Sequence, residues 1–318
     1  MMLAEAAAAT RAGPLSDFDL SEADRYELKI AGLLHDCGKI TTPVHVVDKA
    51  TKLETLFDRI HLLDTRFEVL LRDAEIAHLR GGMDADAYAA QVAAIDADRA
   101  LLHRANTGGE FMDDAQLAAV ARIAARTWTP HGEPMQPFLS ADEIENLSIR
   151  RGTLTMKERE IINHHIVMTI RMLEALPWPQ HLTKVPEYAG GHHERMDGKG
   201  YPRGLTREQM SVPARVMGIA DIFEALTARD RPYKPGKTLS ESLNILGRMK
   251  LDHHVDPDIF DVFLRERVYL DYAHRFLEPN QIDRVDWAKV PGVDAALAAL
   301  LTARDAGDAA APTTGVAA

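Results

Sequence analysis

The chain has 318 residues, enough for one large domain or two ordinary ones, and its 46% hydrophobic and 27% charged residues are typical of a globular protein. Its net charge of -11 disfavours binding to a nucleic-acid polymer, because that function needs a basic face. The single cysteine, Cys37, excludes a disulfide framework and a thiolate metal cluster, and no apolar run approaches the length of a membrane span, so we expect a cytoplasmic protein.

Helical periodicity dominates the first half of the chain. Apolar residues at three- and four-residue spacing predict a helix over Glu22–Lys39 and longer helices over Leu53–Arg80 and Asp84–Arg104. Because Gly81 and Gly82 lie between the last two, these helices should form an antiparallel hairpin. The hairpin either packs on its own domain or forms a coiled-coil arm that makes the protein a homodimer.

The second half is helical as well. We expect a helix over Asp113–Arg126, followed by a proline-punctuated linker over Thr127–Arg151. Thr155 and Glu158 then have the spacing of a capping box, which predicts the start of a helix. The composition from about Ala303 onward predicts disorder, and the fold class is all-α. Three further helices are expected, over Pro213–Ala228, Leu239–Lys250 and Pro257–Phe276.

Four separate segments carry histidine or aspartate where solvation alone explains little. Each lies in an otherwise apolar helical pattern or beside a glycine-rich turn, where an unpartnered charge or imidazole would be unfavourable. A dinuclear metal site of imidazoles and carboxylates would satisfy them together. The residues are His35 and Asp36, His164 and His165, His192 and His193, and Asp221.

Three blocks of sequence resemble the signature of a known family. They read AGLLHDCGKI from Ala31, HHERMDGKGYPRGL from His192 and ARVMGIADIFEALTARDRPYK from Ala214. Together they resemble the HD-GYP family, a branch of the HD metal-dependent phosphohydrolases whose members hydrolyse the bacterial second messenger cyclic di-GMP. The resemblance covers about Leu20–Pro43 and Gly152–Leu264. It implies an HD-type helical bundle with a long inserted helical hairpin.

The resemblance also implies roles for individual residues. Asp36 would bridge two metals and, with Lys39 beside a phosphate oxygen, take part in catalysis. For the helix histidine, His165 fits the family pattern, and His164 is the alternative. The implied metal ligands are His35, Asp36, His165, His192, His193 and Asp221. The implied substrate-binding residues are Arg231, Lys234, Tyr201 and Gly200, with Tyr201 either stacking on a guanine or anchoring its loop.

The implied chemistry is hydrolysis of a phosphodiester by water with two divalent metals as cofactors. Ligands without thiolates suit iron or manganese, with zinc as an alternative. The implied domain plan is residues 1–54 and 151–290 for the HD-GYP domain, 55–150 for a helical insertion with linker, and 291–318 for a disordered tail. The family's usual partners would be a cyclic dinucleotide and diguanylate cyclase (GGDEF) domains that bind the GYP loop.

One feature departs from the family pattern. Family members usually place a further ligand histidine upstream of the HD pair, and no histidine precedes His35. Either an upstream segment is missing from this chain, or one metal lacks a protein ligand, and we expect the chain as given to turn over weakly. Two alternatives to a cyclic di-GMP phosphodiesterase follow: a hydrolase of another cyclic dinucleotide, and a sensor or scaffold that binds without hydrolysis.

Overall fold

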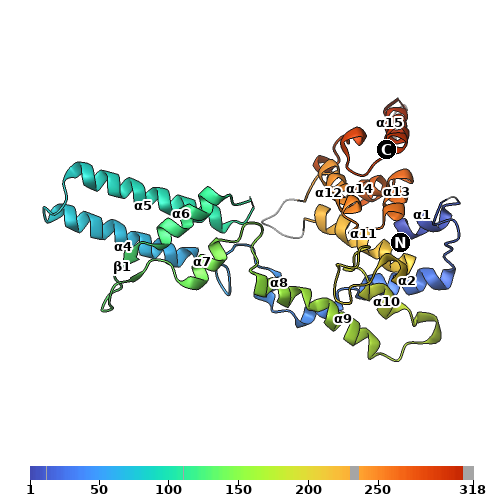
Figure 1. Cartoon of the computed structure of the whole chain (residues 1–318), viewed down its shortest axis with the longest axis horizontal. Helices are drawn as coiled ribbons and strands as arrows, with labels where there is room; N and C mark the ends of the chain where they lie inside the picture. The colour runs from blue at the N-terminus through green and yellow to red at the C-terminus, as the bar shows by residue number, and fades with distance from the viewer. Residues whose placement is uncertain (12, 110, 230–235, 311–318) are drawn as a thin grey trace, which may run out of the picture. The chain divides into compact units, whose positions relative to one another are not determined.

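The computed structural model describes residues 1–11, 13–109, 111–229 and 236–310. In this part of the chain the fold is helical, apart from one pair of two-residue strands, which confirms the all-α prediction. The chain divides into two compact units, one formed by Met1–Thr41 with the described residues from His164 on, and the other by Thr42–Asn163. The expected domain boundaries at 54/55 and 150/151 stay a prediction beside this division into units (Figure 1).

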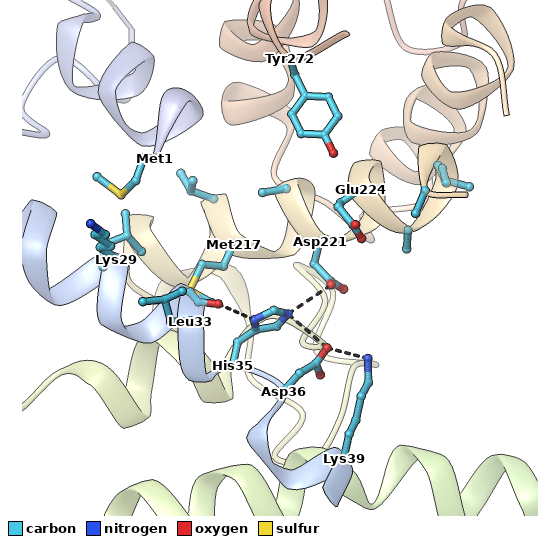
Figure 2. A pocket seen from close by; sticks show the side chains of 17 residues that line it. Met1, Lys29, Leu33, His35, Asp36, Lys39, Met217, Asp221, Glu224 and Tyr272 are labelled. Carbon is cyan, nitrogen blue, oxygen red and sulfur yellow. Dashed lines mark hydrogen bonds and ion pairs between the residues drawn. The ribbon is translucent and has the colours of Figure 1, made fainter. Parts of the chain in front are cut away.

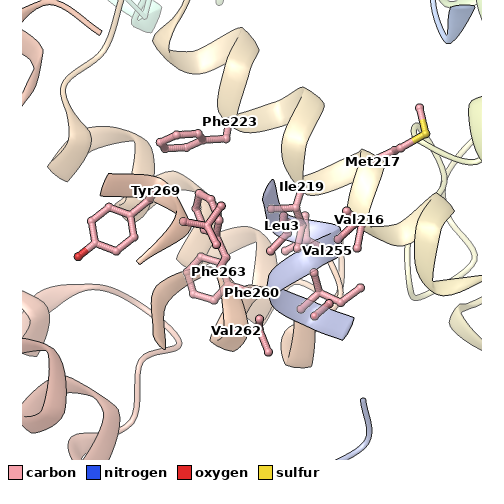
Figure 3. Close-up of a cluster of buried hydrophobic side chains, with 14 of the residues drawn as sticks. Leu3, Val216, Met217, Ile219, Phe223, Val255, Phe260, Val262, Phe263 and Tyr269 are labelled. Atoms are coloured by element: carbon pink, nitrogen blue, oxygen red, sulfur yellow. The ribbon is translucent and has the colours of Figure 1, made fainter. Parts of the chain in front are cut away.

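The unit that begins at Met1, called unit 1 here, surrounds one apolar core. Leu3 of α1, Phe223 of α11 and Phe260 of α13 are all buried in it (Figure 3). The rings of Phe223 and Phe263 meet edge to face with centroids 5.0 Å apart, which suits aromatic quadrupoles. The helices of unit 1 are α1 (Met2–Ala9), α2 (Glu22–Leu34), α9 (His165–Glu174), α10 (Val185–Gly190), α11 (Val212–Thr227), α12 (Leu239–Leu251), α13 (Pro257–Arg265), α14 (Val268–Phe276) and α15 (Ala295–Ala310).

The inserted unit, Thr42–Asn163, is called unit 2 and contains the predicted helical hairpin. Helices α4 (Ile60–Leu79) and α5 (Ala85–Asn106) run antiparallel (Figure 1). Their apolar stripe packs inside unit 2 against α6 (Asp114–Ala124) and α7 (Ala141–Leu147). Dimerisation through the hairpin stays a prediction. The other elements are α3 (Val44–Val47), α8 (Met156–Asn163) and the antiparallel strands β1 (Thr127–Trp128) and β2 (Gln136–Pro137).

Several predicted element boundaries were wrong. Residues 53–59 are irregular rather than helical, and the predicted linker over Thr127–Arg151 contains the strand pair and α7. Helix α7 begins with a capping box in which Ser140 and Glu143 bond each other's backbone. The helix predicted over Pro257–Phe276 is broken in two, because Arg267 adopts a left-handed backbone conformation with φ of 55°.

The predicted disorder near the C-terminus was also wrong for residues up to 310. Helix α15 runs over Ala295–Ala310, and its Leu297 and Leu301 are buried in the core of unit 1. Two leucines at a spacing of one turn are enough to attach an alanine-rich helix to an apolar surface. Residues 311–318 of the expected tail lie outside the described residues.

Unit 2 contains two buried lysines in contrasting surroundings. Lys49 Nζ donates to both carboxylate oxygens of Glu158, at 2.8 and 2.9 Å, and to Asn146. Lys52 is only 1% exposed, and its Nζ lies 2.6 Å from Met112 Sδ, with no carboxylate at ion-pair distance among the described residues. Burial lowers the pKa of Lys52 to about 8.

Replacing Lys52 by methionine should therefore stabilise the protein. In the unfolded chain Lys52 keeps its proton up to the ordinary lysine pKa, whereas in the folded chain it loses the proton near pH 8. The charged lysine therefore lowers the free energy of unfolding most below about pH 8, and this effect fades as the pH rises above that value. We expect Lys52→Met to raise the free energy of unfolding near pH 7 by about 1–3 kcal/mol. Urea unfolding should show this gain shrinking as the pH rises toward about 9.5.

Lys49→Met is the matched control, since it removes a lysine that has a carboxylate partner. It should destabilise the protein, because Glu158 would lose its counter-charge. A lower stability of Lys52→Met at every pH would show that the ammonium group of Lys52 is not a burden to the fold.

Candidate metal centre

The HD pair lies where α2 ends rather than within a helix. His35 is the C-cap of α2, Asp36 lies in the following turn, and a 3₁₀ helix (Cys37–Thr41) comes next. The Gly38 N–H donates to Thr169 Oγ1 of α9 at 2.9 Å, so this donor is satisfied by a distant side chain instead of by a continued helix. The predicted helix over Glu22–Lys39 therefore stops at Leu34.

A second break places the helix histidine. The segment predicted as one helix after Thr155 is divided at His164, which is exposed and precedes α9. His165 is 4% exposed and lies 3.1 Å from Asp36, measured from Nε2 to Oδ1. The structure thus brings His165 to the HD pair and turns His164 to the surface. The Thr155–Glu158 capping box forms as predicted.

Backbone carbonyls fix the orientation of two imidazoles. His35 Nδ1 lies 2.8 Å from the Gly32 oxygen, and His192 Nδ1 lies 2.6 Å from the Ala189 oxygen. Because a carbonyl oxygen only accepts, each Nδ1 must carry the proton. Each Nε2 therefore faces the cluster, where a bound metal would take the place of a proton on it, which is the orientation that metal-binding histidines use.

Asp36 is shared by two groups of potential ligands. One group is Asp36, His165, His192 and His193, and the other is His35, Asp36 and Asp221, with the ligand atoms of each group within 4.8 Å of one another. His35 Nε2 lies 3.3 Å from Asp36 and 3.5 Å from Asp221. The structure therefore brings together all six residues expected to bind metal, and they form a cluster that can hold a metal ion.

Electrostatic effects differ among these groups. Burial would raise the pKa of Asp36, but hydrogen bonds from His165, His35 and Lys39 hold it far below the usual range. Burial would lower the pKa of His35, but the carboxylates of Asp221 and Asp36 raise it to about 10. Burial and the neighbouring His192 lower the pKa of His193 to about 3, which keeps its imidazole neutral.

The donor set fits a cation. His192 Nε2 is buried without a hydrogen-bond partner within the described part of the chain, and it lies 3.9 Å from Asp36 Oδ1, which His165 Nε2 approaches to 3.1 Å. Two imidazole nitrogens, His165 Nε2 and His193 Nε2, lie 3.2 Å apart. Buried polar atoms are normally satisfied, so atoms that converge without partners indicate a missing positive ligand. Nitrogen and oxygen donors without thiolate suit borderline transition metals.

Glu194 stabilises the glycine-rich loop that follows the histidine pair. This carboxylate is 3% exposed and accepts the backbone N–H groups of Arg203 at 2.8 Å and Leu205 at 2.9 Å. At Gly200, a Cβ would lie 2.4 Å from the Arg195 nitrogen, so only glycine fits there. The Tyr201 ring stacks on His193, with centroids 4.9 Å apart, as expected for a residue that anchors its loop.

A cavity of about 560 Å³ opens beside the cluster (Figure 2). His35, Asp36 and Asp221 line it, together with Lys39, whose Nζ donates to Asp36 Oδ2 at 2.6 Å. Tyr201 and Gly200 are not among its lining residues, and Arg231 and Lys234 lie outside the described residues. Sequence reasoning missed three lining or supporting residues, Lys29, Glu194 and Tyr272. Of these only Glu194 had a signal in the sequence, because it directly follows the histidine pair.

Comparison with known proteins supports an assignment to a family. Two HD-domain families match the chain, one over residues 1–101 and one over residues 139–259. The two matches together support membership of the HD-domain family. The match over residues 1–101 continues beyond Pro43, where the resemblance in the motifs ended, and the matched segments contain the whole candidate metal cluster.

Relatives support the HD-GYP branch of this HD-domain family. A 3′3′-cGAMP-specific phosphodiesterase of Vibrio cholerae is 46% identical over 26% of this chain and 19% of its own. A cyclic di-GMP phosphodiesterase of Pseudomonas aeruginosa is 37% identical over 36% of this chain and 26% of its own, and one of Thermotoga maritima is 33% identical over 38% and 32%. The chain thus spans between a fifth and a third of the length of these relatives.

None of the described helices combines the length and the apolar character that crossing a lipid bilayer requires.

Gly38 offers a direct test of how this HD-domain site is held. A Cβ at Gly38 would lie 2.0 Å from the His165 carbonyl oxygen and 2.5 Å from the Thr169 nitrogen, both backbone atoms that cannot rotate away. Gly38→Ala should therefore push α9 from the HD turn, lower the free energy of unfolding by about 1–3 kcal/mol, and reduce the amount of metal bound after loading with iron or manganese. Elemental analysis and denaturant unfolding measure both effects.

Gly307→Ala is the matched control, because a Cβ at this position in α15 meets no protein atom within 4 Å. It should leave metal content unchanged. Normal metal content in Gly38→Ala would mean that the contact between the HD turn and α9 does not position the cluster.

Proposed function

We propose that this chain is a metal-dependent phosphodiesterase that hydrolyses cyclic di-GMP to linear pGpG, to GMP, or to both. The observation that carries the proposal is the sharing of Asp36 between two groups of ligands at the edge of a cavity. A carboxylate in this position suits two metals held close together. The cyclic di-GMP phosphodiesterases among the relatives add support for the substrate.

The proposed ligands are His35, Asp36 and Asp221 for one metal, and Asp36, His165, His192 and His193 for the other. Bound divalent metals would neutralise a phosphodiester and make a water molecule a better nucleophile. We propose iron or manganese, since the donors are imidazoles and carboxylates, with zinc as the alternative.

The chain's own residues orient the reaction. The backbone carbonyls of Gly32 and Ala189 hold His35 and His192 with each Nε2 toward the cluster. Asp36 fixes Lys39 Nζ at the cavity wall, where its remaining N–H groups can donate to a phosphate oxygen. Water adds to phosphorus and the ribose 3′ oxygen leaves. Arg231 and Lys234 are proposed to bind the phosphates, and Gly200 and Tyr201 to shape the loop beside the substrate.

A second substrate has specific support. The V. cholerae relative at 46% identity is named for 3′3′-cGAMP, a cyclic dinucleotide with one adenine in place of guanine. The residues of the cluster act on the phosphodiester and not on the base, so the metal centre serves either substrate equally.

We also propose the family's partners and setting for this chain. The GYP loop presents Lys199 with its side chain 79% exposed, a position from which the loop can meet a diguanylate cyclase domain. The single cysteine of the chain fits the reducing cytoplasm, which is the proposed location. The α4–α5 hairpin is proposed as a contact between two copies of the chain.

The deciding experiment is turnover by the full chain after anaerobic loading with iron or manganese. We expect hydrolysis of cyclic di-GMP, with 3′3′-cGAMP measured beside it, and loss of both metal and activity in Asp36→Asn. Binding of cyclic di-GMP without hydrolysis by the metal-loaded protein would favour a sensor instead.

Lys39 and Arg231 should separate in kinetics. Lys39→Ala removes a donor close to the reacting phosphate, so kcat should fall by roughly 100-fold with a small change in KM. Arg231→Ala should mainly raise KM, because a group that holds the substrate equally in ground and transition states affects binding alone. Equal changes of kcat and KM in both variants would refute these two roles.

A further inference from the structure

One face of α2 continues the wall of the cavity away from the metal cluster. Lys29, Gly32 and Leu33 of α2 line the cavity together with Asp36 of the following turn, and their spacing of three and four residues puts the three helical residues on the same side of α2. At a rise of about 1.5 Å per residue, Lys29 lies about 6 Å from Leu33 along the helix axis, and Asp36 follows beyond the end of the helix. Figure 2 shows Lys29 and Lys39 on opposite sides of His35.

Lys29 adds positive charge to a wall that carries three carboxylates. The carboxylates of Asp36, Asp221 and Glu224 line the same cavity. Lys39 already donates to Asp36, whereas Lys29 is exposed and makes no ion pair with any described residue. The ammonium group of Lys29 is therefore available to an anion inside the cavity.

Gly32 lies between these two positions and has no packing role. Glycine inside a helix is less stable than alanine there, so its presence needs a reason. A Cβ at Gly32 would meet no protein atom within 4 Å, and no neighbouring element therefore requires its small size. Because Gly32 has no side chain, nothing projects into the cavity from this position between Lys29 and Asp36.

We propose that Lys29 binds a second phosphate group of the substrate, and that Gly32 leaves the path between the two phosphates clear. The inference rests on the proposed function, since a cyclic dinucleotide carries two phosphodiesters. The one that is cut lies by Asp36 and Lys39, and the other reaches the ammonium group of Lys29. A lysine suits this position, because its flexible four-carbon side chain and three N–H donors can bind a phosphate in more than one geometry.

The test compares two substrates that differ in phosphate number. Cyclic di-GMP has two phosphodiesters, and bis(p-nitrophenyl) phosphate has one. With metal-loaded full chain, Lys29→Ala should lower kcat/KM for cyclic di-GMP roughly 10-fold more than for bis(p-nitrophenyl) phosphate, mainly through KM, which is the scale of one lost charge-assisted hydrogen bond. Lys29→Arg should recover most of the loss, because it keeps the charge.

Binding without turnover gives a second readout. Equilibrium binding of cyclic di-GMP in the presence of EDTA should weaken in Lys29→Ala and much less in Lys29→Arg. Lys184→Ala is the matched control, since Lys184 is an exposed lysine of the same unit that does not line the cavity. Gly32→Leu fills the open path, so it should show the same selectivity between substrates as Lys29→Ala.

The outcomes separate the two proposals. If the wild-type chain hydrolyses both substrates and Lys29→Ala changes both equally or neither, the role of Lys29 is overturned and the proposed function stands. If the wild-type chain hydrolyses neither substrate, both proposals fall. An effect of Lys184→Ala as large as that of Lys29→Ala would reduce Lys29 to general surface charge. Because Lys29 is exposed, its variants should fold, and circular dichroism checks this for Gly32→Leu.

Discussion

The hydrogen bond from the Gly38 N–H to Thr169 Oγ1 joins segments that lie 131 residues apart in the sequence. It stops α2 at the HD pair and seats the following turn against α9, where Thr169 is fully buried. In the same arrangement His165 of α9 lies 3.1 Å from Asp36. Unit 2 is inserted between the two segments and has its own core, so its folding does not require any residue of the cluster.

The cluster is a group of mutually dependent side chains. Asp36 lies near His35, His165 and His192, and its charge is what makes the approach of several imidazoles favourable. Removing it would leave buried imidazole nitrogens facing one another, and such atoms are unfavourable without a partner. The backbone contacts of His35 and His192 restrict each ring to one tautomer, so the chain determines which nitrogens face inward before any ligand arrives.

The sequence predicted the identity of the cluster much better than its local backbone. The six clustered residues were predictable because their types are unusual within apolar or glycine-rich segments and because the motifs resemble a known family. The end of α2 at Leu34 was not predictable, since Thr169, which accepts the Gly38 N–H just after this helix, is distant in sequence. Helix α15 was missed because an alanine-rich composition does not reveal that Leu297 and Leu301 meet a core.

Lys29 and Glu194 show two further limits of sequence reasoning. A lysine on a helix has no signature of its own, and its place on the cavity wall follows only once α2 is oriented against α11. Glu194 looks like a third ligand in a row of ligand types, yet its carboxylate is taken up by two backbone N–H groups of the loop it supports. Residue type alone could not distinguish these roles.

The overall charge of -11 is compatible with binding an anion, because the distance of each charge from the ligand matters more than the total charge. At physiological salt the screening length is about 8 Å, so most surface carboxylates do not act on a ligand inside the cavity. The charges that do act are those on its wall, where the carboxylates of Asp36, Asp221 and Glu224 lie among the cationic groups of Lys29, Lys39 and His35. Metal cations at the cluster would add positive charge to this wall and strengthen its attraction for a phosphate. Recognition of an anion and retention of metal are therefore coupled in this cavity, and loss of metal should weaken ligand binding as well as catalysis.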